Sequence, residues 1–302
     1  MSRLDIYKSC TLCPRRCGID RTAKKGFCGA DSTLRIARYS RHYWEEPPIS
    51  GENGSGTVFF CSCSLKCVFC QNFVISHGQT GYEITTDELA EVFLQLQQKG
   101  ANNINLVTPT HYLPHILDAL DIVKNDLTIP VVYNCGGYES VETIEMLKGY
   151  VDIFLPDMKY FDRSLSYEYS RAADYFDTAL KAVKKMVDIV GSPVFDDKGL
   201  LKSGVIVRHL VLPNERHDSI NVIKALGENF NSDEILLSLM SQFTPTEQCK
   251  DIEKLSRRTT TFEYESVMKV VEELGFSGYF QQRTSAKSEY IPEFFNNKKV
   301  TN

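Results

Sequence analysis

The alternation of strand and helix patterns between residues 57 and 274 constrains the fold most strongly. Six short runs rich in β-branched and other apolar residues are typical of strands: 57–61, 103–107, 130–133, 151–155, 205–212 and 235–239. Stretches with apolar residues at helical spacing separate them. This order predicts an α/β fold with a parallel sheet and right-handed crossovers. Six units are too few for a closed eight-stranded barrel, so we expect a partial (β/α)6 barrel.

The length of the chain, 302 residues, is enough for one large domain with a small appendage. We expect a small cysteine-rich, metal-binding N-terminal element with a linker at residues 1–50, the barrel at 51–290 and a flexible tail at 291–302. Residues 31–52 contain two adjacent prolines and Gly51 and are predicted to be irregular.

Charge and hydropathy exclude some classes of partner. The net charge is −5 and basic runs are short, which argues against nucleic acid. No apolar run approaches the length of a membrane span, and no signal peptide is evident, so we expect no membrane partner. Ten cysteines without a secretion signal indicate metal or redox chemistry in a reducing compartment. We therefore expect a cytoplasmic protein.

A triplet of cysteines follows the first predicted strand, with Cys63, Cys67 and Cys70 in a C-x3-C-x2-C pattern. Three thiolates can bind three irons of a [4Fe–4S] cluster, whereas ordinary ferredoxins supply four. An iron without a protein ligand is open to another molecule, as at reactive metal sites. The alternative is zinc, whose ligands usually come in two C-x2-C pairs. The triplet fits zinc poorly, although Cys61 is available as a fourth ligand.

A second set of cysteines has the pattern C-x2-C-x3-C-x10-C, with Cys10, Cys13, Cys17 and Cys28. This glycine-rich segment has too few apolar residues for a core of its own, and a bound metal would stabilise it. Thiolates bind both zinc and iron–sulfur clusters. The four filled positions in a short segment favour structural zinc, and an auxiliary iron–sulfur cluster is the alternative.

Polar residues recur at the carboxyl ends of the predicted strands, where α/β barrels carry their chemistry. Residues 108–111 follow the second strand, 134–138 the third and 156–160 the fourth. The fifth strand contains Arg208 and His209. These positions would suit a polar cofactor.

The cysteine triplet, with Phe69 directly before its last member, resembles the signature of the radical S-adenosylmethionine (SAM) enzymes. In these enzymes the amine and carboxylate of SAM bind the open iron. Reductive cleavage of SAM then yields a 5′-deoxyadenosyl radical that abstracts a hydrogen atom. Residues 102–111, 155–160 and 208–213, with the motif Cys-x2-Cys-Pro-Arg-Arg-Cys, resemble an uncharacterised group of homologues of pyruvate formate-lyase activating enzyme.

The resemblance implies several cofactor contacts. Asp157 matches an aspartate that helps to hold SAM, and Lys159 a lysine that lies in the site. Asn134 and Gly136 stand where activases contact the ribose or methionine part of SAM.

Three further residues, Thr108, Thr110 and His209, complete the predicted site. Activases carry a Gly-Gly-Glu-like turn after the second strand, and here Thr108 and Thr110 take that place and offer acceptors for the SAM amine. His209 is either a residue of the site or the donor of a structural hydrogen bond.

The predicted function is therefore that of a radical SAM enzyme that contains a [4Fe–4S] cluster, SAM and a second metal site. A one-electron donor such as flavodoxin or ferredoxin would reduce it, and a glycyl radical enzyme is a candidate partner. The alternatives are a radical SAM enzyme that modifies a small molecule, a peptide or a tRNA, and a metal-binding protein without catalytic activity.

Overall fold

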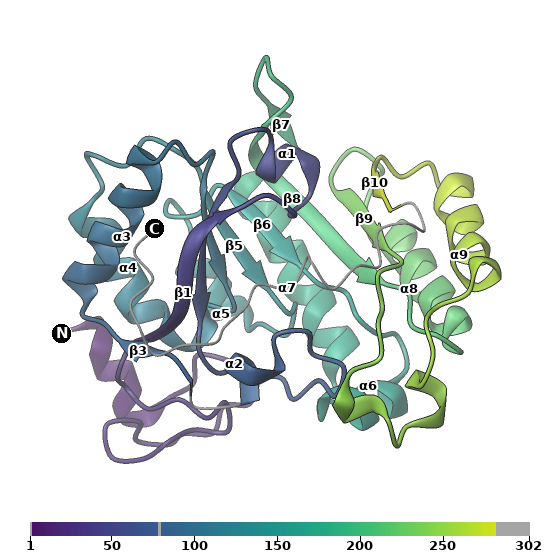
Figure 1. The fold of residues 1–302 in the computed structure, drawn as a ribbon, viewed down its shortest axis with the longest axis horizontal. Coiled ribbons are helices and arrows are strands. Elements are labelled where there is room, and N and C mark those ends of the chain that lie inside the picture. Colours follow the sequence, from purple (N-terminus) through teal and green to yellow (C-terminus); the bar gives the residue numbers. More distant parts are fainter. Residues whose placement is uncertain (1, 78–79, 282–302) are drawn as a thin grey trace.

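The computed structural model describes residues 2–77 and 80–281. One sheet runs through the molecule in the order β10-β9-β8-β6-β5-β4-β2-β1-β3, and β7 pairs with β8 beside this path (Figure 1). The strands are β1 (Arg35–His42), β2 (Ser55–Phe60), β3 (Tyr82–Glu83), β4 (Ile104–Val107), β5 (Val131–Cys135), β6 (Ile153–Pro156), β7 (Val194–Phe195), β8 (Leu201–Leu210), β9 (Leu236–Met240) and β10 (Gly278–Phe280). From β2 to β10 along this path neighbouring strands are parallel, whereas β1 is antiparallel to β2 and β3.

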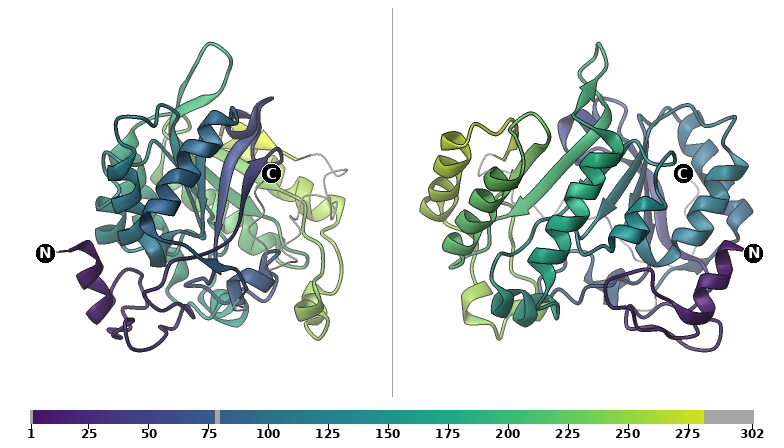
Figure 2. Two further views of the ribbon diagram at one scale, coloured as in Figure 1. Left: turned by 60° about the vertical axis from the view of Figure 1, so that its left-hand side comes forward. Right: turned by 180° about the vertical axis from the view of Figure 1, so that it is seen from behind.

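Most of the helices cover the outer side of this sheet (Figure 2). They are α3 (Thr86–Gln98), α4 (Leu113–Ile122), α5 (Val141–Glu145), α6 (Arg163–Ser170), α7 (Tyr175–Val190), α8 (Arg216–Asn229) and α9 (Thr261–Glu273). Two short helices, α1 (Pro47–Ser50) and α2 (Phe73–His77), lie at opposite ends of the sheet (Figure 1). Short 3-10 helices occur at Arg3–Ser9, Thr110–Tyr112, Glu247–Cys249 and Glu253–Leu255.

The central strands are apolar because both of their faces are covered. Every residue of β4, β5 and β6 is buried. Alternate residues serve two cores, as expected for the two-residue period of a strand. Tyr133 and Phe154 belong to the large core that includes the helices, whereas Val132, Ile153 and Leu155 belong to a smaller cluster on the inner side of the sheet.

Helix α1 closes the inner side of the sheet near the amino ends of the parallel strands. Its Ile49 is fully buried in the inner cluster. The side chains of Asn102 and Asn103 donate hydrogen bonds to the carbonyls of Ser50 and Ile49, at 2.6 and 2.7 Å. Polar residues directly before β4 therefore hold α1 in place, and the carboxyl ends of the strands remain as the place for a site.

The six predicted strands correspond to β2, β4, β5, β6, β8 and β9, and the α/β fold with a mostly parallel sheet is confirmed. The prediction of irregular structure at residues 31–52 was wrong, because β1 and α1 lie there. Since β1 pairs with β2, the sheet begins before the predicted boundary at residue 50. The predicted tail at 291–302 lies outside the described residues. In the part of the chain that the structure describes, no helix has the length and apolar character of a membrane span.

Candidate active site

The loop that carries the cysteine triplet begins directly after β2 and ends at α2. Ser62 has a φ of +77°, a left-handed conformation that turns the chain away from the strand direction. The Ser62 N–H donates to the Ile75 carbonyl at 2.8 Å, which joins the start of the loop to α2. Cys63, Cys67 and Cys70 lie between these two fixed points.

Distant segments of the chain hold the outer side of this loop. The Val68 N–H donates to the Tyr169 carbonyl in α6 at 2.9 Å, and the Thr246 hydroxyl donates to the Val68 carbonyl at 3.4 Å. The Cys28 carbonyl accepts from the Cys63 N–H at 3.4 Å. The N-terminal segment, α6 and the segment after β9 therefore fix the loop together.

The three thiols line one cavity of about 250 Å³. The Ser170 hydroxyl donates to Cys67 Sγ at 2.9 Å, the Ser76 hydroxyl to Cys70 Sγ at 3.2 Å, and the Leu65 N–H to Cys63 Sγ at 3.4 Å. Each cysteine sulfur thus accepts a hydrogen bond, which favours thiolates bound to a metal.

Burial makes these thiols difficult to ionise without a positive counter-charge. Burial, and next the neighbouring Cys67, raise the pKa of Cys70 to about 11. Burial followed by Cys67 and Cys70 also raises the pKa of Cys63. A cationic cluster would offset both effects, because metal binding requires and stabilises thiolates. The residues present therefore fit an iron–sulfur cluster.

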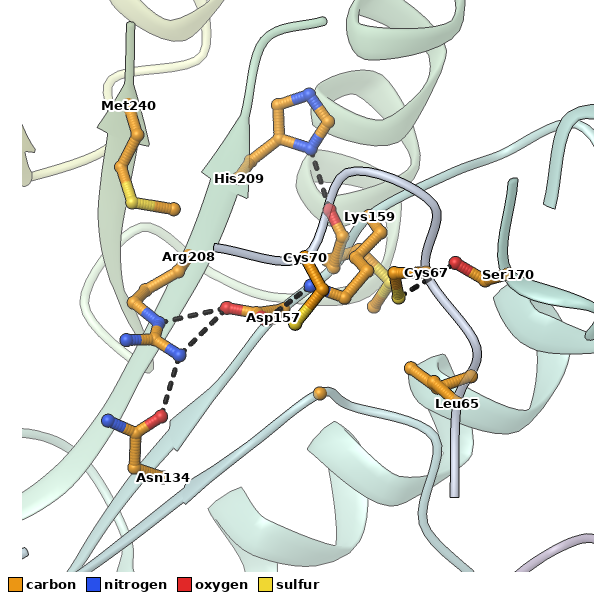
Figure 3. Close-up of polar contacts among 12 residues, drawn as sticks. Leu65, Cys67, Cys70, Asn134, Asp157, Lys159, Ser170, Arg208, His209 and Met240 are labelled. Carbon is orange, nitrogen blue, oxygen red and sulfur yellow. Dashed lines mark hydrogen bonds and ion pairs between the residues drawn. The ribbon is translucent and has the colours of Figure 1, made fainter. Parts of the chain in front are cut away.

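A buried ionic network faces the thiols from the carboxyl ends of β6 and β8 (Figure 3). Lys159 Nζ lies 2.5 Å from Asp157 Oδ2, and Arg208 donates to Asp157 Oδ1 at 2.9 Å. Arg208 also donates to Asn134 Oδ1 at 2.7 Å. Burial would raise the pKa of the Asp157 carboxyl, but Arg208 and Lys159 outweigh it and hold this pKa below its ordinary value. Asp157 is therefore a carboxylate with two cationic neighbours.

The turn after β5 packs tightly against this network. Gly137 has a φ of +78°, and a Cβ at this position would lie 1.9 Å from the Asp157 carbonyl oxygen. The Tyr175 hydroxyl lies 2.8 Å from the carbonyl oxygens of both Gly136 and Asp157 and accepts from the Lys159 N–H at 3.0 Å. This contact requires glycine at position 137.

Five of the residues predicted to contact SAM or to act in the site line the cavity of the thiols: Thr108, Asn134, Gly136, Asp157 and Lys159. Thr110 and His209 do not. The Thr110 hydroxyl donates to Glu139 Oε1 at 2.7 Å. His209 Nδ1 lies 2.6 Å from the Met158 carbonyl oxygen, and burial lowers the pKa of this imidazole to about 4. For His209 the structure therefore favours the structural hydrogen bond.

Arg208 and Glu45 also line the cavity. The sequence analysis placed Arg208 in the fifth strand without assigning it a contact, and it missed Glu45. The signal for Arg208 was the two-residue period of β8, in which Val205 and Val207 belong to the outer core. Arg208 therefore points to the inner side and His209 does not. Glu45 lies in the segment that was predicted to be irregular, and its sequence neighbours contain no comparable signal.

The remaining cysteines have other surroundings. The Cys61 thiol contacts the Thr80 carbonyl at 2.8 Å, and Cys61 does not line the cavity, so the structure does not favour it as a fourth ligand. Cys135 contributes to the cavity wall, and its thiol is buried near the carboxyl group of Glu139.

The N-terminal cysteines lie near one another. Cys10 and Cys28 are buried, Cys13 is partly buried and Cys17 is exposed. A Cβ on Gly26 would lie 3.5 Å from Cys28 Sγ and 3.7 Å from Cys17 Sγ. Among residues 2–77 and 80–281, no three His, Cys, Asp or Glu side chains are arranged around a single metal ion. A second metal site is therefore not shown. The absence of a single-ion site does not test a [4Fe–4S] cluster at the cysteine triplet, because in such a cluster each thiolate binds a different iron.

Comparison with known proteins agrees with this geometry. Residues 57–226 match the family model of the radical SAM superfamily. The uncharacterised protein MJ0674 of Methanocaldococcus jannaschii is 30% identical over 277 residues, which are 89% of this chain and 75% of that protein.

Two solved structures share the fold at low sequence identity. A radical SAM methyltransferase from Sphaerobacter thermophilus has a TM-score of 0.52 at 12% identity, over 75% of this chain and 66% of that one. Streptococcus suis SuiB bound to precursor peptide SuiA has a TM-score of 0.50 at 14% identity, over 73% of this chain. The chain spans only 46% of SuiB. The family match covers more than half of the chain, so the protein belongs to the radical SAM superfamily, whose members are enzymes that use a [4Fe–4S] cluster and SAM.

Proposed function

We propose that Cys63, Cys67 and Cys70 hold the [4Fe–4S] cluster and that SAM binds beside them in the same cavity. The observation that carries this proposal is the single cavity lined by all three thiols and by polar residues from the ends of β4, β5 and β6. When bound, the cluster and SAM would supply a 5′-deoxyadenosyl radical that abstracts a hydrogen atom from a substrate.

The residues of the cavity suit the methionine end of SAM, which carries an ammonium and a carboxylate. Asp157 and Asn134 offer oxygen acceptors for the ammonium, and Lys159 and Arg208 offer cationic donors for the carboxylate. Thr108 and Gly136 form the adjoining wall. The chain would thus orient SAM and exclude water, while the cofactors carry out the difficult chemistry.

The class of substrate is the finer part of the proposal. One solved structure with a similar fold is bound to a precursor peptide and another is a methyltransferase. We therefore place a peptide or a small molecule ahead of a glycyl radical enzyme, which only the sequence resemblance implies. The reductant is proposed to be a one-electron donor such as flavodoxin or ferredoxin.

Anaerobic reconstitution with iron and sulfide, followed by dithionite and SAM, tests the proposed chemistry. We expect release of 5′-deoxyadenosine from the wild-type protein. Cys67→Ala is expected to lose both this product and the absorption of the [4Fe–4S] cluster, because one iron loses its ligand. Cys61→Ala, a cysteine of the same segment outside the cavity, is the matched control and should retain both.

Two results would contradict the proposal. A protein with a full cluster that releases no 5′-deoxyadenosine would favour a non-catalytic metal-binding role. Retention of the cluster in Cys67→Ala would show that other residues bind it.

We also propose that the four N-terminal cysteines hold a second metal, because of their spacing in the sequence and because the thiols of Cys17 and Cys28 both lie close to Gly26. Iron and zinc measured per chain in Cys67→Ala should then show this metal still present. Loss of both metals from a folded variant would contradict two independent sites.

A further inference from the structure

A second cavity of about 410 Å³ adjoins the cavity of the thiols. Trp44, Glu45 and Gln242 line both cavities. Tyr43 and Gln281 line only the second one, whereas the three cysteines, Asp157 and Lys159 line only the first. Glu45 therefore stands at the boundary between the proposed cofactor site and a separate space large enough for a small molecule or a side chain.

Among residues 2–77 and 80–281, little positive charge lies around the carboxylate of Glu45. Its Oε1 accepts from the Asn105 amide at 3.0 Å, and its Oε2 lies 3.8 Å from Arg208. Arg208 makes its shorter contacts with Asp157 and Asn134. The side chain of Glu45 is only 11% exposed, so water screens its charge poorly.

A second carboxylate increases this imbalance. Glu46 is 9% exposed, and its Oε2 has no hydrogen-bond partner among the described residues. Burial, and next Glu46, raise the pKa of Glu45 to about 7. Among the described residues, Arg208 thus interacts with three carboxylates, those of Asp157, Glu46 and Glu45, whereas Lys159 pairs with Asp157. An additional cation beside Glu45 would supply the missing positive charge.

The other walls of the second cavity suit the remainder of a cationic molecule. Trp44 is 58% exposed and Tyr43 is 46% exposed, so aromatic surface lies at the cavity. Aromatic faces attract ammonium and guanidinium groups. Gln281 donates to Gln242 Oε1 at 3.1 Å, which places two amides on the wall for polar contacts.

We propose that the second cavity binds the substrate and that this substrate carries a protonated amine or a guanidinium group, which Glu45 binds. The assignment of the second cavity to the substrate rests on the proposed function. If SAM binds beside the three thiols, the adjoining cavity is the place from which a substrate can reach the radical. The ammonium of SAM is another source of the same charge. Glu45 lines both cavities, and only the second one contains none of the three thiols, so the SAM affinity of Glu45→Gln distinguishes the two sources.

Trp44 provides a reporter at this site, since it is the only tryptophan in the chain. The full-length reconstituted protein is titrated with Nα-acetyl-lysine methylamide and, as neutral counterpart, Nα-acetyl-norleucine methylamide. We expect a saturable change of tryptophan fluorescence with the lysine compound and affinity weaker by about tenfold or more for the norleucine compound. Nα-acetyl-arginine methylamide, whose only cationic group is the guanidinium, tests that group in the same way.

Glu45→Gln is expected to weaken binding of the lysine compound by a similar factor. The exposed Glu52 makes Glu52→Gln the matched control, which removes the same charge outside both cavities. If Glu45→Gln does not fold, the paired titrations of the wild type still decide the question.

Three outcomes would overturn the proposal. The first is equal binding of the charged and neutral compounds, and the second is unchanged binding of the lysine compound by folded Glu45→Gln. The third is a loss of SAM affinity in Glu45→Gln as large as the loss for the lysine compound, which would assign the carboxylate to the cofactor. Release of 5′-deoxyadenosine by the wild type is measured separately, so a failure of the proposed function is distinguished from a failure here.

Discussion

Ser170 forms a buried hydrogen-bonded chain that ends on a proposed cluster ligand. Its hydroxyl lies 2.7 Å from the Tyr160 hydroxyl and donates to Cys67 Sγ at 2.9 Å. Ser170 and Tyr160 are both fully buried. When Ser170 donates to the sulfur, Tyr160 donates to Ser170, so the hydroxyl has a fixed direction. Hydrogen bonds to cluster sulfurs are one of the factors that set reduction potentials.

Ser170→Ala is therefore expected to make the reduction potential of the cluster more negative, because the reduced cluster loses a stabilising hydrogen bond. A redox titration followed by electron paramagnetic resonance measures the shift. Ser166→Ala is the matched control, since Ser166 lies in the same helix and donates to the Arg163 carbonyl. Equal potentials in wild type and Ser170→Ala would show that this hydrogen bond does not tune the cluster.

The residues of the site were predictable where local sequence determines them. The spacing of the cysteine triplet predicts its grouping, and the ends of β5 and β6 locate Asn134 and Asp157. Thr110 was not predictable, because Thr108 has a φ of +58° and a 3-10 helix follows. This local turn directs the Thr110 side chain to Glu139. Such a conformation is uncommon for a β-branched residue and has no reliable sequence signal.

At the level of elements, the buried strands were predictable and β1 was not. Strands β4, β5 and β6 are continuous apolar runs because both faces are covered. Strand β1 reads Arg-Ile-Ala-Arg-Tyr-Ser-Arg-His and is partly exposed along most of its length. Its pairing with β2 fixes it, and such long-range pairing is not visible in its own residues.

The turn after β5 gives a prediction at the same scale. Gly137→Ala should destabilise the protein by at least about 2 kcal/mol more than Gly149→Ala, because its Cβ would overlap the Asp157 carbonyl. Gly149 has a similar positive φ of +81° but no atom within 4 Å of a Cβ, so it controls for backbone strain alone. Urea unfolding of both variants measures the difference. Equal losses would mean that the backbone near Asp157 adjusts freely.

For the whole molecule, buried carboxyl groups determine how stability depends on pH. Glu139 is 2% exposed and accepts from Thr110 and Tyr133. Burial outweighs these hydrogen bonds and raises the pKa of Glu139 to about 8. The folded protein thus keeps a proton that the unfolded chain loses near pH 4.3. Stability therefore falls as the pH rises between these values, by up to about 1.4 kcal/mol per pH unit.

Glu139→Gln should flatten this decline. The free energy of unfolding is measured in urea between pH 6.5 and 8, above the range in which buried neutral histidines such as His111 would also contribute. Glu142→Gln is the control, because the side chain of Glu142 is 71% exposed. A slope as steep in Glu139→Gln as in the wild type would show that Glu139 is already ionised at pH 6.5.

The anchoring of the cysteine loop also bears on the order in which the protein matures. Val68, in the middle of the loop, is held by Thr246 and Cys249, which follow it by most of the length of the domain. A ribosome exposes the triplet long before it has added these two residues. The loop therefore reaches its final conformation only after residues 246–249 have been translated and have folded onto it, so an iron–sulfur assembly system would meet a finished loop only after that point.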